Sequence, residues 1–404
     1  MVDLGLPKVK RPKQVGLSSG RLERVSAALR DDVDRGLIPG AVLVIARGGQ
    51  IGYAEAFGWR DREKKAPMGF DAIFRVASMT KPVTSVAAMM LAEEGKLQIA
   101  APVADYLPEF KDRTVGVERV RAQRTMTVQD LLRHTSGLTY AQFGDSAAQM
   151  LWRDANLMTE DQTNEELVTK LAQLPLMFEP GTTWEYSMST DVLGRVVEVA
   201  SGQSLADFFA ARITGPLGMT DTAFEATGER TDRVAEPQID PATGARPPMR
   251  NVGLACRWAS GGGGLVSTAA DYLRFCQMLL NGGELDGTRL LAPGTVRHMA
   301  SDHLPPDVGY GPTARERFGA LAPVPEMGYG FGLGFAVRTA AGRCPLPGSV
   351  GEYFWGGVYG TAFSIDPVEQ LIVVAMMLAP DRRLYYRHLL RPLVYGAVTG
   401  PVAR

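Results

Sequence analysis

The strand-forming segments of this chain lie at its two ends, with a long stretch of other patterns between them. Near the N-terminus, Ala41–Ala46 and Ile51–Phe57 flank Arg47-Gly48-Gly49-Gln50, which is typical of a β-hairpin with a glycine turn. Strand patterns return near the C-terminus, over Gly330–Arg338, Tyr359–Asp366 and Leu371–Met377. There are thus two early strands and three late ones, with helices at both termini. We therefore expect one antiparallel sheet built from both ends of the chain.

Helical patterns occupy most of the remaining chain. Leu22–Asp34 comes before the early strands and has apolar residues at helical spacing, and the strongly apolar segment Pro82–Glu94 comes after them. Leu384–Val398 is expected to be a helix kinked or interrupted at Pro392. This arrangement predicts an α+β fold: an antiparallel sheet flanked by terminal helices, plus an all-α lobe, with the active site in the cleft. The expected division is a tail over 1–19, a discontinuous sheet domain over 20–100 and 257–404, and a mainly helical domain over 101–256.

Charge and composition exclude several classes of function. The 404 residues carry 43 basic and 44 acidic side chains, a net charge of −1, which gives no overall field for nucleic acid or an anionic membrane. Three scattered cysteines and four histidines show no metal-ligand spacing, so no metal and no cofactor are expected. No apolar stretch approaches the roughly 20 residues of a membrane span. The N-terminal sequence lacks the apolar core of a secretory signal, which predicts a cytoplasmic protein.

Ser78-Met79-Thr80-Lys81 is the local motif with the clearest chemistry. Residues i and i+3 share one helical face, so the amine of Lys81 can stand beside the hydroxyl of Ser78. Serine becomes a good nucleophile when a neighbour takes its proton, and lysine can do so if its pKa is lowered. A helix start also offers free N–H groups for an oxyanion. The tetrapeptide alone equally fits an N-cap serine followed by a solvated lysine.

Two other motifs compete with this serine. Gly16-Leu17-Ser18-Ser19-Gly20 matches the G-x-S-x-G nucleophile elbow, but it follows a polar segment instead of a buried strand. His134 could act as the base of a triad. Its place after a predicted helix favours a histidine that hydrogen-bonds the last helical carbonyls.

Further motifs accompany Ser78 and Lys81 in a fixed order along the chain. They are Leu131–Leu138 (LLRHTSGL), Tyr186-Ser187, Pro216–Met219 with Asp221-Thr222, the glycine run before Leu265–Thr268, and Trp355-Gly356-Gly357. Together they resemble the serine β-lactamase and penicillin-recognising superfamily, and within it the class C β-lactamases and the family VIII carboxylesterases. The resemblance covers about residues 20 to 395 and implies a β-lactamase/DD-peptidase-like fold.

The resemblance assigns roles to matching positions. It implies that Ser78 is the acylated nucleophile, that Lys81 accepts its proton, and that Tyr186 takes part in proton transfer. It also implies an oxyanion hole from the N–H groups of Ser78 and Val358. Gly356 and Gly357 would let the substrate approach that backbone closely. A buried structural tyrosine and a plain glycine turn remain the alternatives for these two motifs.

Three positions depart from the lactamase pattern or add to it. Met188 stands where the lactamases place an asparagine, and Trp355 stands where they place a lysine. Both changes favour uncharged esters over anionic β-lactams, and similar residues occur in family VIII esterases. Tyr140 resembles a tyrosine at the active-site rim of those esterases, although an ordinary loop tyrosine fits as well.

The sequence therefore predicts a serine carboxylesterase that hydrolyses short, uncharged, small-molecule esters through an acyl-enzyme. An acyltransferase or a weak β-lactamase on the same fold is the alternative, and a non-catalytic scaffold is a third. Neither nucleic acid nor membrane is expected as a partner, and the oligomeric state stays open.

Overall fold

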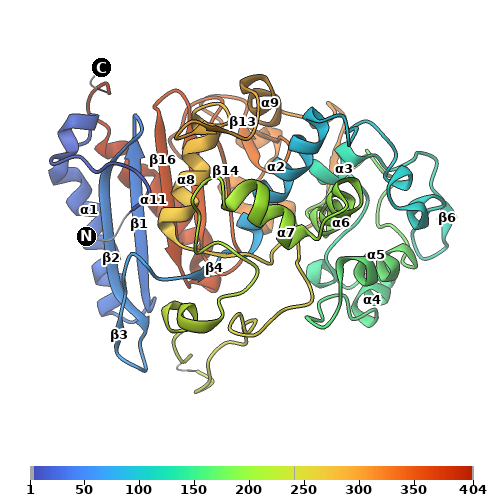
Figure 1. The fold of residues 1–404 in the computed structure, drawn as a ribbon, viewed down its shortest axis with the longest axis horizontal. Helices are drawn as coiled ribbons and strands as arrows, with labels where there is room; N and C mark the ends of the chain where they lie inside the picture. The colour runs from blue at the N-terminus through green and yellow to red at the C-terminus, as the bar shows by residue number, and fades with distance from the viewer. Residues whose placement is uncertain (1–3, 241, 403–404) are drawn as a thin grey trace.

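The computed structural model describes residues 4–240 and 242–402, and it contains the sheet expected from the two chain ends. Eight strands are hydrogen-bonded in the order β12-β13-β14-β15-β16-β1-β2-β3 (Figure 1). Their bounds are β1 Gly40–Arg47, β2 Gln50–Asp61, β3 Ala66–Pro67, β12 Tyr329–Phe331, β13 Ala336–Arg338, β14 Tyr353–Gly356, β15 Ala362–Asp366 and β16 Leu371–Met377. All neighbouring pairs in this sheet are antiparallel.

β1 and β16, the first and last strands of this sheet in chain order, are paired in its interior. β1 pairs with β16 from Ala41↔Met377 to Arg47↔Leu371, and on its other side it pairs with β2. Every residue of β1 is buried, so the strand is covered on both faces. This explains why its sequence is continuously apolar instead of alternating.

Alternate residues of the central strands contact different helices. Ala41, Leu43 and Ile45 pack with α1 (Ser19–Asp34) and α11 (Arg383–Ala397) on one face. Val42, Val44 and Ala46 belong to the larger core on the other face, with α2 (Thr80–Glu93) and α8 (Ala269–Leu280). Figure 1 shows α1 and α11 on the outer side of the sheet and the helices α3–α6 beyond α2.

The helices and short strands outside these layers have the following bounds. The helices are α3 Val128–Leu132, α4 Ala147–Asp154, α5 Asn164–Ala172, α6 Ser189–Ser201, α7 Leu205–Phe209, α9 Pro293–Met299 and α10 Ala314–Phe318. Short strand pairs are β4 Phe74–Arg75 with β8 Val266–Ser267, β5 Thr114–Val115 with β6 Val120–Arg121, β7 Thr183–Trp184 with β11 Gly309–Tyr310, and β9 Glu284–Leu285 with β10 Thr288–Arg289.

The structure corrects one late strand and excludes an interruption of the last helix. The segment 330–338 is not one strand but the hairpin β12–β13, because the N–H of Gly332 bonds the carbonyl of Phe335 and Gly334 adopts a φ of 108°, which favours glycine. The helix α11 runs without interruption from Arg383 to Ala397 with Pro392 inside it.

Residues 4–18, which precede α1, contact the rest of the fold. Pro7 and Val9 hydrogen-bond the backbone of Ile51 in β2, at 2.7 and 3.1 Å. Val15 and Leu17 are fully buried in the core beneath α1. The expected division at residues 101 and 256 stays a prediction, since one hydrophobic core includes residues from both proposed domains.

Across the described residues, the helices fall short of the length and apolarity that a bilayer span requires. The cytoplasmic location stays a prediction.

Candidate active site

One large cavity contains most of the residues that the sequence singled out. Its volume is about 790 Å³. Ser78, Tyr140, Tyr186 and the segment Gly356–Tyr359 line it, together with the glycine run Gly262–Gly264. The cavity therefore brings the start of α2, the strand β14 and the connections around α3 and α6 to one place.

The backbone before α2 fixes the position of Ser78. Residues Ala77–Met79 form a 3-10 turn that leads directly into α2, and Ala77 has a φ of 46°. A non-glycine residue in this region is strained, and such strain is held by surrounding contacts. Here Tyr272 donates a hydrogen bond to the Met79 carbonyl at 2.8 Å, and Thr361 donates one to the Val76 carbonyl at 3.2 Å. Ser78 is not the N-cap of α2, so that alternative was wrong.

Lys81 is fully buried beside Ser78, which excludes the solvated lysine. Its Nζ lies 3.5 Å from Ser78 Oγ, 2.9 Å from Tyr140 Oη and 2.7 Å from the Gly262 carbonyl. The three contacts match the three N–H bonds of an ammonium. Tyr140 is thus not an ordinary loop tyrosine, because it lines the cavity and hydrogen-bonds Lys81.

The pKa of Lys81 is shifted in the direction opposite to the one expected. Burial lowers the pKa of Lys81, but the charges that Tyr140, Tyr186 and Asp191 can carry outweigh burial, and the net pKa is raised. Burial likewise raises the pKa of Tyr140, against the opposing effect of Lys81. The sequence argument required a lysine with a lowered pKa. The raised pKa instead favours the ammonium form of Lys81.

Tyr186 lies over Lys81 and is held by Trp355. The Nζ of Lys81 is 4.7 Å from the centre of the Tyr186 ring, a cation–π contact. Trp355 Nε1 donates a hydrogen bond of 3.2 Å to Tyr186 Oη. Tyr186 therefore meets a cation at its ring face and a hydrogen-bond donor at its oxygen.

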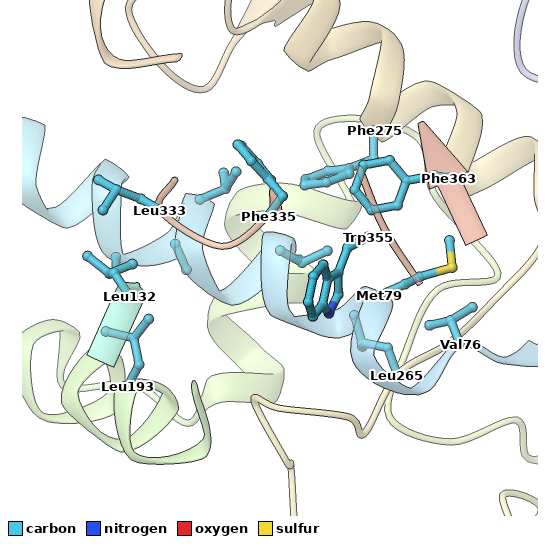
Figure 2. Packing of buried hydrophobic residues seen from close by; sticks show 14 of the residues in the cluster. Val76, Met79, Leu132, Leu193, Leu265, Phe275, Leu333, Phe335, Trp355 and Phe363 are labelled. Atoms are coloured by element: carbon cyan, nitrogen blue, oxygen red, sulfur yellow. The ribbon is translucent and has the colours of Figure 1, made fainter. Parts of the chain in front are cut away.

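Trp355 and Met188 do not present apolar surface to the cavity, contrary to the sequence interpretation. Trp355 is 4% exposed and belongs to the buried cluster drawn in Figure 2, and its ring contacts those of Tyr186 and Phe331. Met188 is 1% exposed. Neither is among the residues that line the cavity. The expected preference for uncharged esters thus loses the argument on which it rested.

The segment after β14 supplies the second candidate oxyanion donor. β14 pairs with β15 through Trp355↔Phe363 and Gly356↔Ala362, whereas its pairing with β13 ends at Phe354. The exposed Val358 follows on the unpaired side and lines the cavity. Within the described chain, its N–H has no backbone partner.

The reason for the two glycines differs from the one expected. A Cβ at Gly356 would lie 2.5 Å from the Arg387 guanidinium, and one at Gly357 would lie 2.5 Å from the Val76 carbonyl. The glycines therefore allow the strand to pack against α11 and against the segment that leads to Ser78. Contact with the rest of the protein, and not only with substrate, requires them.

The two competing motifs lie outside the nucleophile's contacts. Ser18 precedes α1 and donates its N–H to the Ala397 carbonyl at 2.8 Å, away from the cavity lining. His134 is buried, and its Nδ1 lies 3.2 Å from Ser187 Oγ. It was therefore wrong to expect this ring to bond helical carbonyls. Burial and the nearby Lys81 hold the His134 pKa well below its usual value, so the ring is neutral.

Asp191 is a buried carboxyl of the site that sequence reasoning missed. Its Oδ1 accepts hydrogen bonds from Ser260 Oγ at 2.5 Å and from the Gly262 N–H at 3.1 Å. The Gly262 carbonyl in turn accepts from Lys81. Burial raises the Asp191 pKa, and Lys81 opposes that rise. The glycine run was the available signal, since a Cβ at Gly262 would lie 2.2 Å from Asp191 Oδ2.

Comparisons with known proteins agree with this geometry. The model of the family described as Beta-lactamase matches residues 25–385. Protein Rv1367c of Mycobacterium tuberculosis is 36% identical over 372 residues, covering 88% of this chain and 90% of that protein. Esterase EstB of Burkholderia gladioli is 34% identical over 362 residues, covering 83% of this chain and 85% of EstB.

A solved structure of high similarity carries an activity in its description. It is EstCE1, "a hydrolase with promiscuous acyltransferase activity", which superposes with a TM-score of 0.79 at 30% identity and covers 94% of this chain and 98% of its own. The fold and the resemblance to family VIII esterases are thereby confirmed. With the family match, the esterase relative and the enclosed Ser78–Lys81 pair, the chain belongs to the β-lactamase family and is a serine hydrolase of the esterase type.

Proposed function

We propose that the protein is a carboxylesterase that forms an acyl-enzyme on Ser78. The observation that carries the proposal is the group of Ser78, Lys81 and Tyr140 at the wall of the cavity, with Lys81 Nζ between the two hydroxyls. The activities named for EstB and EstCE1 support an ester as the substrate.

The proton of Ser78 leaves through Lys81. In the reactive form the Lys81–Tyr140 pair lacks one proton, which leaves an ammonium beside a phenolate. As Ser78 Oγ attacks the ester carbonyl carbon, its proton passes to Lys81 Nζ, and Lys81 gives one of its own protons to Tyr140 Oη. The pair then holds both protons, and Ser78 has formed the new C–O bond.

Tyr186, whose ring lies beside Lys81, serves the leaving group. Its phenol donates a proton to the alcohol oxygen as the C–O bond of the tetrahedral intermediate breaks, and the Trp355 indole stabilises the phenolate that remains. Water then attacks the acyl-enzyme and returns a proton to that phenolate. Ser78 leaves with the second proton, from the Lys81–Tyr140 pair.

The negative charge of the tetrahedral intermediate falls on the former carbonyl oxygen. The N–H groups of Ser78 and Val358 are proposed to hold it. Val358 is suited to this because its N–H is unpaired and its segment is fixed by the Gly357 N–H, which bonds the Thr361 carbonyl at 2.8 Å. Removal of one such donor typically costs about 10²–10³-fold in kcat.

The size of the substrate is less restricted than the sequence suggested. A cavity of about 790 Å³ lies within the upper part of the range for drug-sized ligands, so short acyl chains are not required. The same space can admit an alcohol in place of water, and EstCE1 combines both reactions. Acyl transfer to an alcohol is therefore the second candidate function, and weak β-lactam turnover would use the same nucleophile.

The test is a rate profile over p-nitrophenyl esters of increasing acyl length, with nitrocefin in parallel and product analysis with added butanol. We expect ester hydrolysis in wild type and none in Ser78→Ala, and a butyl ester among the products if transfer competes. Faster turnover of nitrocefin than of every ester would replace the proposal with a β-lactamase. A protein inert on all of them, and unlabelled by a fluorophosphonate, would be a non-catalytic scaffold.

A further inference from the structure

Positive charge gathers on the wall of the cavity that α10 and α11 form. Five arginines line the cavity, against the two carboxylates of Glu160 and Asp191, although the whole chain carries a net charge of −1. Glu160 is exposed at the edge, and Asp191 is engaged by Ser260 and Gly262. The excess of positive charge is therefore local to the cavity.

Four of the five arginines form no ion pair with a carboxylate among the described residues. Of these, Arg250 donates to the Phe224 and Gly264 carbonyls, both at 2.6 Å. The other three, Arg317, Arg383 and Arg387, lie on the α10 and α11 wall and are half-buried. In contrast, Arg75 forms an ion pair of 3.1 Å with Glu236. Buried or half-buried cations in proteins are usually paired. An unpaired group of three at a substrate cavity therefore calls for an explanation.

The hydrogen bonds of these arginines go to neutral oxygens. Arg317 donates to Thr313 Oγ1 and to the Gln142 carbonyl, both at 3.1 Å, and its guanidinium lies 3.6 Å from the centre of the Phe143 ring. Arg383 donates to the Pro380 carbonyl at 2.9 Å. Each guanidinium has five N–H bonds, so both keep donors for another partner.

Arg387 connects this group to the catalytic strand. It donates to the Gly357 carbonyl at 2.6 Å and to the Thr361 carbonyl at 3.3 Å, and its Nε is buried without a partner. Gly356 leaves the room that its guanidinium fills, as a Cβ there would lie 2.5 Å away. The charge is thus held next to Val358, the proposed oxyanion donor.

The three charges are close enough to oppose one another. Burial and the charge of Arg383 lower the pKa of Arg387 to about 10, and the same two causes lower the pKa of Arg317. Glu316 and Glu185 raise the Arg317 pKa, but burial and Arg383 outweigh them, and neither carboxyl forms an ion pair with Arg317. An anion bound here would relieve this repulsion.

We propose that Arg317, Arg383 and Arg387 form a subsite for a carboxylate on the ester substrate, so that the enzyme prefers anionic esters to neutral ones. This inference rests on the proposed esterase function and names its substrate class. Trp355 stands where the lactamases place a lysine, so this position carries no positive charge. The arginines of α10 and α11 would supply positive charge to the cavity instead. A monocarboxylate fits better than a phosphate dianion, since desolvating a second charge costs more than the half-buried site returns.

Matched pairs of esters test the subsite. One pair is mono-4-nitrophenyl glutarate and its methyl ester, with the charge on the acyl side. The other is 3-carboxy-4-nitrophenyl butyrate and its methyl ester, with the charge on the alcohol side. We expect one pair to show a kcat/KM ratio, anionic over neutral, of about ten or more, from charge-assisted hydrogen bonds to the guanidiniums.

The variant Arg383→Gln should lower that ratio about tenfold, because it removes a charge without touching Gly357. Arg382→Gln, in the neighbouring position but outside the cavity lining, should keep the wild-type ratio. A wild-type ratio at or below one for both pairs would overturn the subsite. So would a ratio that Arg383→Gln leaves unchanged.

A binding measurement separates this inference from the esterase proposal. Monomethyl glutarate is titrated calorimetrically into Ser78→Ala, with inorganic phosphate as the competing anion. Binding that Arg383→Gln abolishes supports the subsite even if no ester is hydrolysed. Ester hydrolysis without such binding and without a charge preference would leave the esterase standing and remove the subsite. Tighter binding of phosphate would reassign the anion.

Discussion

Replacing Tyr140 with phenylalanine tests how Lys81 is tuned. The change removes one oxygen, the acceptor that lies 2.9 Å from Lys81 Nζ, and keeps the ring that packs against Phe143 and Tyr186. Hydrogen bonds to charged groups contribute about 1.5–3 kcal/mol, which corresponds to roughly 10- to 150-fold in rate. Because the oxygen is also part of the proton path, we expect kcat/KM to fall about 10²-fold.

The pH dependence of the same variant gives a sign that a structural role would not produce. Wild-type kcat/KM should rise with pH, because the Lys81–Tyr140 pair must lose a proton and both pKa values are raised. Without Tyr140, one cause of the raised Lys81 pKa disappears. The rising limb of the Tyr140→Phe profile should therefore move to lower pH.

The measurement is kcat/KM for a p-nitrophenyl ester across pH 6 to about 10, beside urea unfolding to detect any loss of folding. Tyr359→Phe is the matched control, because Tyr359 also lines the cavity and has no side-chain hydrogen bond to Lys81. The reasoning fails if Tyr140→Phe keeps the wild-type rate and pH profile. A limb moved to higher pH would show that Tyr140 lowers the Lys81 pKa instead of raising it.

Three further outcomes follow from the site. Ser78→Ala should abolish ester hydrolysis and fluorophosphonate labelling with the fold intact, whereas Ser18→Ala should behave as wild type; the opposite result would reassign the nucleophile. Lys81→Ala should be almost as damaging as Ser78→Ala, since residues acting as one unit give non-additive losses, which steady-state kinetics of the double variant would check. Trp355→Phe removes the indole donor to Tyr186 and should lower kcat about tenfold. A turnover equal to wild type would show that the reaction does not depend on this hydrogen bond.

The central sheet could be predicted because its strands are locally distinct. The apolar run Ala41–Ala46 and the segment Leu371–Met377 each identify a strand, and their pairing follows from the lack of other partners. The split of 330–338 was missed because Gly332 and Gly334 stand inside an apolar run. Their turn depends on backbone angles that hydrophobic periodicity does not encode.

The site was predictable where chemistry is local in sequence and not where it depends on distant contacts. The spacing of Ser78 and Lys81 was enough to place an amine beside a hydroxyl. The direction of the Lys81 pKa depends on Tyr140, which is 59 positions away, and no spacing rule relates them. The orientation of Trp355 likewise follows from packing between layers, so its identity suggested a role in the cavity that its burial excludes.

The pairing of β1 with β16 joins two segments that are made far apart in time during synthesis. Ala41 leaves the ribosome long before Met377, its partner in the sheet, so the early hairpin waits with one edge open. Such distant pairing makes folding slow, and an open edge is a template for aggregation. Val358 follows β14, and β15 and β16 lie between β14 and β1 in the sheet. We therefore expect a chain shortened before β16 to keep Val358 but to lose the strand that connects its part of the sheet to β1.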